Sequence, residues 1–186
     1  GNISVSHNGN LSNTAELKRR LFAEGSIFQT SSDTELFLHL ISRSRKIDFF
    51  DALTETLLQV KGAYSMTMIH ENNLLAIRDP YGFRPLYMGS KDGATYFASE
   101  TCALDMLKVN EYEPVNPGEI ILCSEKGINR TQFTKPQRKA HCVFELIYFA
   151  RPDSFVFGES VQRTRKLMGK ALAEAEEYEA DVVVPI

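Results

Sequence analysis

The chain has 186 residues, which is enough for one domain or for one domain and part of a second. Its 24 acidic and 21 basic residues give a net charge of −3 without a dense Lys/Arg run, so neither nucleic acid nor a membrane surface is expected as a partner. Apolar residues make up 43% of the chain, and the apolar runs are far too short to cross a bilayer, which is typical of a soluble globular protein.

The three cysteines, Cys102, Cys123 and Cys142, are widely spaced and odd in number. A disulfide framework is therefore not expected, and the lack of a CxxC pair excludes a self-contained zinc ribbon. This use of cysteine favours a reducing, cytoplasmic location.

Neither end of the sequence has the pattern of a natural terminus. The chain begins without Met or a signal peptide, and Ile3 and Val5 alternate with polar residues, which predicts that it opens inside a half-buried strand. The β-branched run at 181–186 is typical of a strand buried in a parallel sheet, which needs neighbouring strands. We therefore expect an internal segment of a longer protein.

Three helices are predicted in the first 60 residues. Asn13 with Glu16 has the capping-box spacing for the first helix, and Ser32 with Glu35 repeats it for the second. A third helix is expected at about 51–60. The residues expected to face inward are Leu17, Leu21 and Phe22, then Leu36, Leu40 and Ile41, then Phe50, Leu53, Leu57 and Leu58.

From residue 62 onward the period changes to that of strands joined by short turns. An aromatic strand is expected at 143–149 and a helix at 162–177. Helices followed by hairpin-linked strands favour an α+β fold, and a change of composition at 151–154 places a domain boundary near residue 150. The predicted hairpins pair 63–69 with 74–77, 86–88 with 95–98, and 120–123 with 128–133.

Three polar segments could carry chemistry. The amide of Asn8 and the backbone N–H of Gly9 could point two donors at one oxyanion, although Asn-Gly also suits a turn that caps the next helix. Asp33 could bind a ligand ammonium, but a carboxylate at a helix start is also explained by capping. Arg78, Asp79 and Arg84 could form a hydrogen-bonded network in a rigid loop stiffened by two prolines.

Two further segments have a plain structural interpretation. Cys142 adjoins His141, and neighbours in a strand point to opposite faces, so a buried free cysteine is the default. The aromatic and charged run at 148–154 has the composition of an interdomain hinge.

Together, these motifs resemble the glutaminase domain of class II glutamine amidotransferases, which use an N-terminal nucleophile. Within that class, the segment 142–154 resembles the amidophosphoribosyltransferase family, and the likeness covers essentially the whole chain. The motifs that carry the class likeness are 7–11, 30–35, 62–64, 78–86 and 98–100.

The resemblance implies a four-layer αββα sandwich at 1–150, followed at 151–186 by a linker helix and the first strand of an α/β phosphoribosyltransferase domain. It implies glutamine hydrolysis by an N-terminal cysteine, with Asn8 and Gly9 as the oxyanion hole, Asp33 as the ligand of the glutamine α-ammonium, and Arg78, Asp79 and Arg84 in a structural loop of the active site. Ammonia would pass to phosphoribosyl pyrophosphate, with Mg²⁺, to give 5-phosphoribosylamine in purine synthesis. A homo-oligomer is expected.

The chain also departs from the family pattern. The nucleophilic cysteine and the arginine for the glutamine α-carboxylate would lie before Gly1, and the phosphoribosyl pyrophosphate loop after Ile186, so no activity is expected of this chain alone. Some members hold a [4Fe–4S] cluster with a cysteine where Cys142 stands, but one match of four leaves the cluster undecided. The alternatives are an amidotransferase of the glucosamine-6-phosphate synthase type and a non-catalytic regulatory module.

Overall fold

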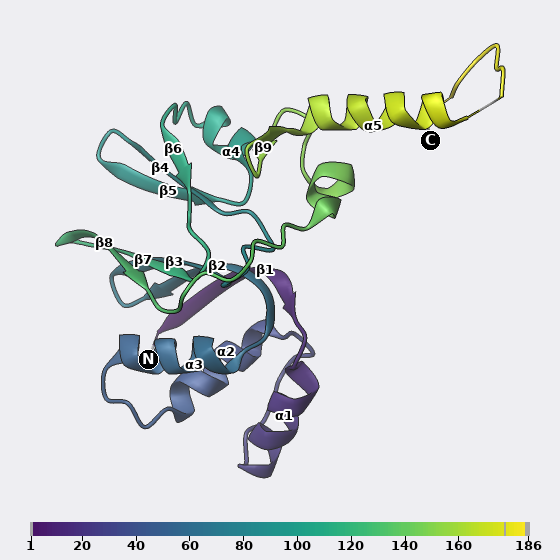
Figure 1. Ribbon diagram of the computed structural model, residues 1–186. Helices are drawn as coiled ribbons and strands as arrows, with labels where there is room; N and C mark the ends of the chain where they lie inside the picture. Colours follow the sequence, from purple (N-terminus) through teal and green to yellow (C-terminus); the bar gives the residue numbers. More distant parts are fainter. Residues whose placement is uncertain (1, 177, 185–186) are drawn as a thin grey trace.

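A five-stranded antiparallel sheet forms the centre of the computed structural model, which describes residues 2–176 and 178–184 (Figure 1). The strands lie in the order β1-β2-β3-β7-β8, and β1 pairs with β2 from Ile3 opposite His70 to Leu11 opposite Gly62. The hairpins β2–β3 and β7–β8 confirm two of the predicted pairs. The strands span Ile3–Leu11 (β1), Gly62–His70 (β2), Asn73–Arg78 (β3), Glu119–Ser124 (β7) and Gly127–Gln132 (β8).

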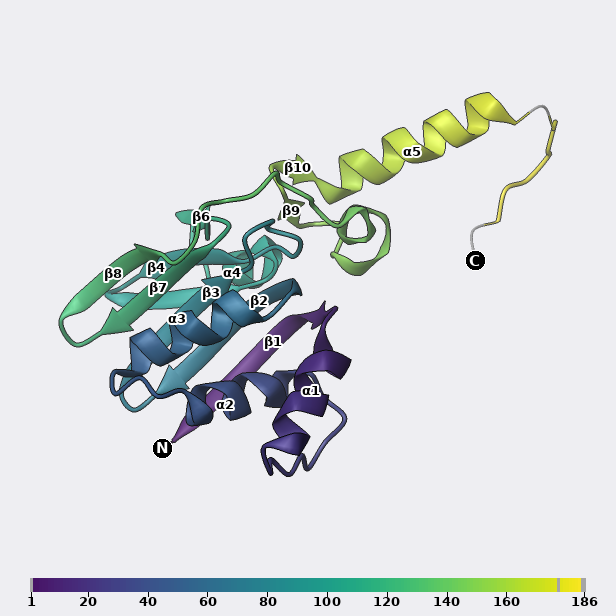
Figure 2. The same cartoon turned by 60° about the horizontal axis from the view of Figure 1, so that its bottom comes forward.

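Three helices cover one face of this sheet (Figures 1 and 2): α1 (Thr14–Ala23), α2 (Thr34–Arg43) and α3 (Phe49–Gln59). Their apolar faces meet the inward side chains of the strands in the largest core cluster. The fully buried members include Leu36, Phe37, Leu53, Met68, Leu75 and Ile77. The inward positions predicted from the helical period are thus confirmed for Leu17, Leu21, Leu36, Leu40, Ile41, Leu53 and Leu57.

A second, three-stranded sheet lies on the opposite face, in the order β5-β4-β6. Ala76 and Ile121 alternate with the residues that face the helices, so they point the other way and pack against Leu86, Met88 and Val115. The short helix α4 covers the outer face of this sheet through Leu104. The result is four layers, helix–sheet–sheet–helix, as expected. The ranges are Tyr87–Lys91 (β4), Ala94–Ala98 (β5), Tyr112–Pro114 (β6) and Thr101–Met106 (α4).

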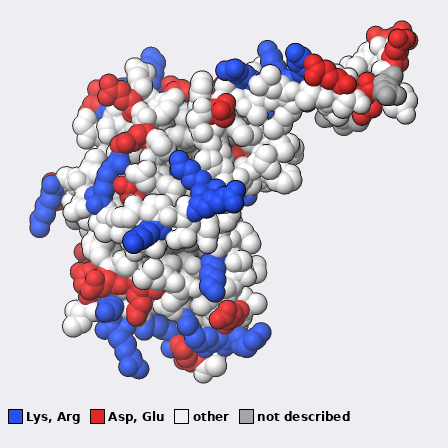
Figure 3. Space-filling model, in the orientation of Figure 1, with Lys and Arg blue, Asp and Glu red and all other residues white. Residues whose placement is uncertain are grey.

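The last part of the chain packs on the second sheet and then leaves the body of the molecule (Figure 1). It contains a π-helix at Glu145–Phe149 (η1), a small hairpin of β9 (Phe155–Val156) and β10 (Glu159–Ser160), and the projecting helix α5 (Val161–Ala175). Basic side chains lie over the start of α5 and acidic ones toward its end, and both signs are spread over the body (Figure 3). Within the described ranges, no helix is long and apolar enough to span a membrane.

The expected start of a transferase domain is not found in the described part of the chain. Residues 181–184 form no strand, and residues 185–186 of the predicted strand lie outside the described residues. Val182, Val183 and Val184 are 74–84% exposed, because nothing here pairs with them. The boundary near residue 150 stays a prediction.

The cap of α1 and the start of α3 differ from the predictions, the first because Asn13 binds a distant segment and the second because of a local cap. The side chain of Asn13 makes no cap bond in α1; it donates to Gln59 O (3.0 Å) and accepts from Lys61 N (2.9 Å) instead. α3 begins two residues early, because Asp48 accepts the N–H groups of Phe50 and Asp51.

The predicted capping box of α2 also does not form. The helix begins after Asp33 rather than Ser32, and Glu35 accepts the backbone N–H groups of Gln29 and Thr30. These bonds, that of Gln29 first, lower the pKa of Glu35 from 4.5 to about 2.

Two burial predictions and one strand prediction were also wrong. Phe22 and Leu58 are 56% and 62% exposed, because each lies at the outer margin of its helix's apolar face. The segment expected as an aromatic strand is mostly the π-helix η1, so its backbone does not pair with a sheet.

Candidate active site

The segment predicted as an Asn-Gly turn is the last part of strand β1. Val5, His7 and Leu11 face the helices, and the ring of His7 lies 5.8 Å from that of Phe37 in α2. Asn8 therefore points to the opposite face, toward the second sheet. The turn interpretation is wrong, because all of 7–10 pairs in register with β2.

Gly9 is required by its close approach to β2. A Cβ at this position would lie 2.0 Å from the carbonyl oxygen of Ala63. Gly9 lies opposite Tyr64, whose carbonyl accepts from Asp79 N on the far side of β2 (2.8 Å). Bonded and non-bonded pairs alternate in an antiparallel ladder, and the polar backbone groups of Tyr64 face β3. The pair of Gly9 and Tyr64 is therefore a non-bonded one, and the N–H of Gly9 points away from β2. It leaves β1 at its open edge, as the N–H of Leu11 does.

Asn8 lines a cavity of about 220 Å³ between β1 and the second sheet. Its amide Nδ2 donates to the hydroxyl of Ser99, at 3.3 Å, just after β5. An amide nitrogen carries two N–H bonds, so the second remains for another acceptor. The other residues around the cavity are Arg84, Glu100, Glu145 and Phe149.

An ion pair closes one side of this cavity. Arg84 Nη1 lies 2.6 Å from Glu145 Oε1, and the Glu145 side chain is only 5% exposed. The Arg84 guanidinium also lies 4.7 Å from the centre of the Phe149 ring. Arg84 thus joins the loop after β3 to η1.

Arg78 belongs to the interior of the same loop. Its guanidinium donates to the carbonyl oxygens of Arg84 (2.9 Å), Val115 (2.7 Å) and Gly82 (3.1 Å). Burial lowers the pKa of Arg78, and the charge of Asp79 opposes that change.

Asp79 is fully buried and holds the other half of the loop. Its carboxylate accepts the backbone N–H groups of Tyr64, Tyr81 and Phe83. Burial raises the pKa of Asp79, and these bonds oppose the rise. Arg78 and Asp79 therefore act as the rigid frame of the loop, and of the three predicted loop residues only Arg84 reaches the Asn8 cavity.

Asp33 lies just before α2, on the helix side of β1. Its Oδ2 accepts the N–H of Leu11 at 2.9 Å, and its Oδ1 lies 3.5 Å from Nδ1 of His7. The side chain makes no helix-capping bond and is 20% exposed. The capping interpretation is thus wrong, and Asp33 meets the open edge of β1 two residues beyond Gly9.

Cys142 is separated from the other two cysteines, and all three are free. Its N–H donates to the carbonyl of Phe83 (3.0 Å). Within the described residues, no group of three His, Cys, Asp or Glu side chains could hold a metal ion. The described residues therefore do not by themselves supply the full thiolate set that an iron–sulfur cluster needs.

Sequence reasoning gave no role to several residues of the site. Ser99, Glu100, Glu145 and Phe149 all stood in recognised segments, 98–100 and 142–154, but none had an assigned function. Glu145 meets Arg84 across 61 residues of chain, a separation that no local pattern reports.

The chain belongs to the family described as a glutamine amidotransferase domain, whose sequence profile matches residues 1–106. The amidophosphoribosyltransferases of Rhizobium etli and Bacillus subtilis are 45% and 41% identical to it, and each match covers the whole chain. The solved glutamine phosphoribosylpyrophosphate (PRPP) amidotransferase of B. subtilis, complexed with ADP and GMP, matches 96% of the chain with a TM-score of 0.90 and 41% identity. The class resemblance of the motifs is confirmed.

The chain spans about two fifths of the length of these relatives: 38% of the R. etli protein, 39% of the B. subtilis protein and 39% of the solved chain. The similarity therefore concerns the glutamine amidotransferase part.

Proposed function

We propose that this chain is the glutaminase part of an amidophosphoribosyltransferase, which hydrolyses glutamine and passes ammonia to phosphoribosyl pyrophosphate to give 5-phosphoribosylamine, the first step of purine synthesis. The observation that carries the proposal is the likeness over 96% of the chain to a PRPP amidotransferase at a TM-score of 0.90. The 45% identical match to the R. etli relative covers the whole chain and so includes the segment 142–154, which favours this enzyme over a glucosamine-6-phosphate synthase. The cavity beside Asn8 favours an enzyme over a regulatory module.

Attack of a thiolate on the glutamine carboxamide places negative charge on the carbonyl oxygen. Two donors of this chain suit that charge. One is the second N–H of the Asn8 amide, since the first donates to Ser99, and the other is the N–H of Gly9 at the open edge of β1. The thiolate itself would come from outside this chain.

Asp33 would bind the α-ammonium group of glutamine. The bond from Leu11 N uses one of the roughly four lone-pair sites of this carboxylate, which stays partly exposed. The substrate would then lie along the open edge of β1, with its ammonium end at Asp33 and its amide end at Gly9 and Asn8.

The remaining expectations concern the whole enzyme. Phosphoribosyl pyrophosphate and Mg²⁺ would bind the transferase part, outside this chain, and a homo-oligomer stays a proposal. A cluster at Cys142 would need ligands from outside the described residues. The free cysteines favour a reducing compartment such as the cytoplasm, although relatives in Arabidopsis thaliana are named chloroplastic.

The test is Asn8→Ala in the full-length protein that contains this chain. Loss of one oxyanion donor is expected to lower the glutamine-dependent rate by about 10²–10³-fold. Synthesis from added ammonia bypasses the oxyanion and should change less than about twofold. The matched control is Asn10→Ala, an exposed asparagine two residues along the same face of β1, which should retain both activities. Equal loss of both activities in Asn8→Ala would falsify the oxyanion role.

A further inference from the structure

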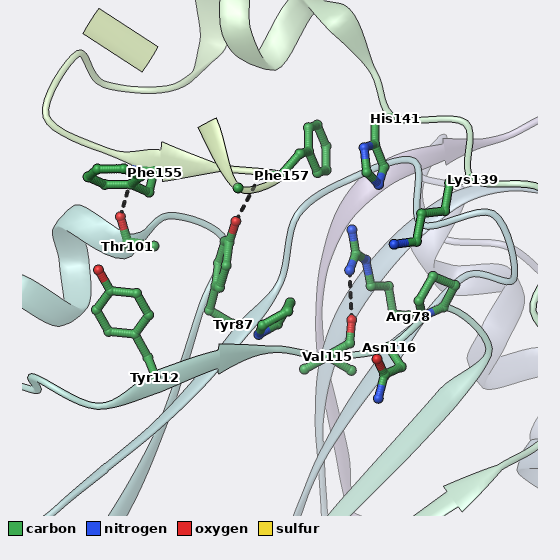
Figure 4. Close-up of a pocket in the computed structure, with 13 residues that line it drawn as sticks. Arg78, Tyr87, Thr101, Tyr112, Val115, Asn116, Lys139, His141, Phe155 and Phe157 are labelled. Atoms are coloured by element: carbon green, nitrogen blue, oxygen red, sulfur yellow. Dashed lines mark hydrogen bonds between the residues drawn. The ribbon is translucent and has the colours of Figure 1, made fainter. Parts of the chain in front are cut away.

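A second cavity, of about 540 Å³, lies between the three-stranded sheet and the β9–β10 hairpin (Figure 4). It shares no lining residue with the Asn8 cavity, and no step of glutamine hydrolysis uses it. Its volume lies in the range of small-molecule binding sites.

Aromatic side chains from two separate elements form one end of this cavity. Tyr87 and Tyr112 come from the sheet, with ring centres 6.2 Å apart, and Phe155 and Phe157 come from the hairpin. Two hydrogen bonds hold the hairpin in place: Phe155 N donates to the Thr101 hydroxyl (2.8 Å) and Phe157 N to the Tyr87 hydroxyl (3.0 Å). The aromatic walls are therefore preformed.

Basic side chains form the other end. Figure 4 shows Arg78, Lys139 and His141 extending toward one another at the cavity wall. The His141 ring stacks on Phe157 at 4.0 Å and 6°, so the basic end adjoins the aromatic end. Burial, and then the charges of Arg78 and Lys139, lowers the pKa of His141, which is consistent with the three groups sharing one space.

Among the described residues, no carboxylate lies in the wall of this cavity, although the charge of the neighbouring Asp79 stabilises the Arg78 guanidinium. Arg78 is 4% exposed, and its three hydrogen bonds go to neutral carbonyl oxygens, which leaves two of its five N–H groups for another acceptor. The carboxylate of Asp79 is committed to backbone N–H groups. A buried cation without an ion-paired partner favours an anion beside it.

We propose that this cavity binds a small organic anion with a planar apolar ring. The ring lies between the tyrosines of the sheet and the phenylalanines of the hairpin, and the anionic group lies at Lys139, His141 and the free N–H groups of Arg78. Aromatic stacking and charge-assisted hydrogen bonds act on opposite ends of the ligand, so both are needed for tight binding.

The experiment measures binding of 1-naphthalenesulfonate to the full-length protein by isothermal titration calorimetry. We expect saturable binding. Sulfate, which lacks the ring, and 1-naphthalenemethanol, which lacks the charge, should each bind at least about tenfold more weakly.

Two variants and their matched controls locate the ligand. Lys139→Glu and Phe155→Ala should each weaken binding at least fivefold. Lys135→Glu makes the same charge change on the same exposed segment, and Phe144→Ala removes another half-exposed phenylalanine, so both should bind as the wild type does.

Three results would overturn the proposal. The first is no saturable binding to the wild type, which means that the cavity is filled by another segment. The others are an affinity of Lys139→Glu and Phe155→Ala equal to that of the wild type, and an affinity for the uncharged alcohol equal to that for the sulfonate. The readout is binding rather than turnover, so it is independent of glutaminase activity.

Discussion

Asn8 and Ser99 are 91 residues apart in the sequence, yet the amide of one donates to the hydroxyl of the other. An asparagine amide can rotate, and a donor aimed at an oxyanion contributes most when its direction is fixed beforehand. Under the proposed role of Asn8, Ser99 would be a positioning residue, because it holds one N–H of the amide and leaves the other for an acceptor in the cavity that Asn8 lines.

Ser99→Ala should lower the glutamine-dependent kcat about fivefold, since a neutral hydrogen bond contributes about 1 kcal/mol. The KM for glutamine should stay nearly constant, because the ammonium site is untouched. Steady-state kinetics with glutamine and with ammonia measure both effects. Ser99→Thr keeps the hydroxyl and should restore the rate; a Thr variant as slow as the Ala variant would argue against positioning.

Asp33→Asn should raise the KM for glutamine about 10–100-fold, because a hydrogen bond to a charged group contributes roughly 1.5–3 kcal/mol. Asn retains an oxygen that can accept the N–H of Leu11, so the end of β1 should stay in place. The measurement is glutamine saturation in the full-length protein, with ammonia-dependent synthesis as the internal reference. Asp51→Asn, an equal charge change on exposed α3, is the control, and an unchanged KM in Asp33→Asn would reject the ammonium role.

Two leucines of helix α3 are expected to differ in how much they stabilise the fold, because they lie on different faces of the helix. Leu53 is fully buried in the main core, whereas Leu58, predicted to face inward as well, is 62% exposed. The helical period allowed both positions, and only the direction from which the sheet approaches separates them.

Leu53→Ala is expected to lower the free energy of unfolding by about 2–5 kcal/mol, because it leaves a cavity in the core. Leu58→Ala should lower it by less than about 0.5 kcal/mol. Urea unfolding followed by circular dichroism compares the two directly. Similar losses for both leucines would contradict the packing of α3.

At the scale of the whole molecule, the Arg84–Glu145 pair connects the central sheet to the last third of the chain. Arg84 extends from the loop that Arg78 and Asp79 hold rigid, and Glu145 begins η1. Arg165 of α5 then donates to the carbonyls of Leu146 and Ala150. This series of contacts orients η1 and α5 relative to the sheets.

Glu145→Ala should therefore destabilise the fold by about 1–3 kcal/mol, less than a fully buried pair because Arg84 is 21% exposed. The exposed pair of Arg151 and Asp153 provides the control, and Asp153→Ala should leave the melting temperature nearly unchanged. Thermal unfolding of both variants tests the difference. Equal melting temperatures for the two variants would mean that η1 is not held by this pair.

The sequence by itself determined the kind of fold and the family. The helical period placed Leu53 on an inward face, and the hairpin pattern placed 74–77 in a strand, because helical and strand periodicities follow from local backbone geometry. The motifs around Asn8, Asp33 and Arg78 identified the class, because each is a short contiguous pattern.

Only the tertiary structure decided how those motifs meet. It showed that Asn8 of β1 points to the second sheet, whereas Asp33 approaches β1 from the side of the helices. It also showed that Ser99 accepts a hydrogen bond from the Asn8 amide and that Glu145 pairs with Arg84 at the cavity. It also replaced the expected caps of Asn13 and Glu35 by contacts to distant or preceding backbone. The physical reason for the distant contacts is that a hydrogen bond or ion pair between residues far apart in the sequence depends on where the layers pack, which the order of residues along one segment does not specify.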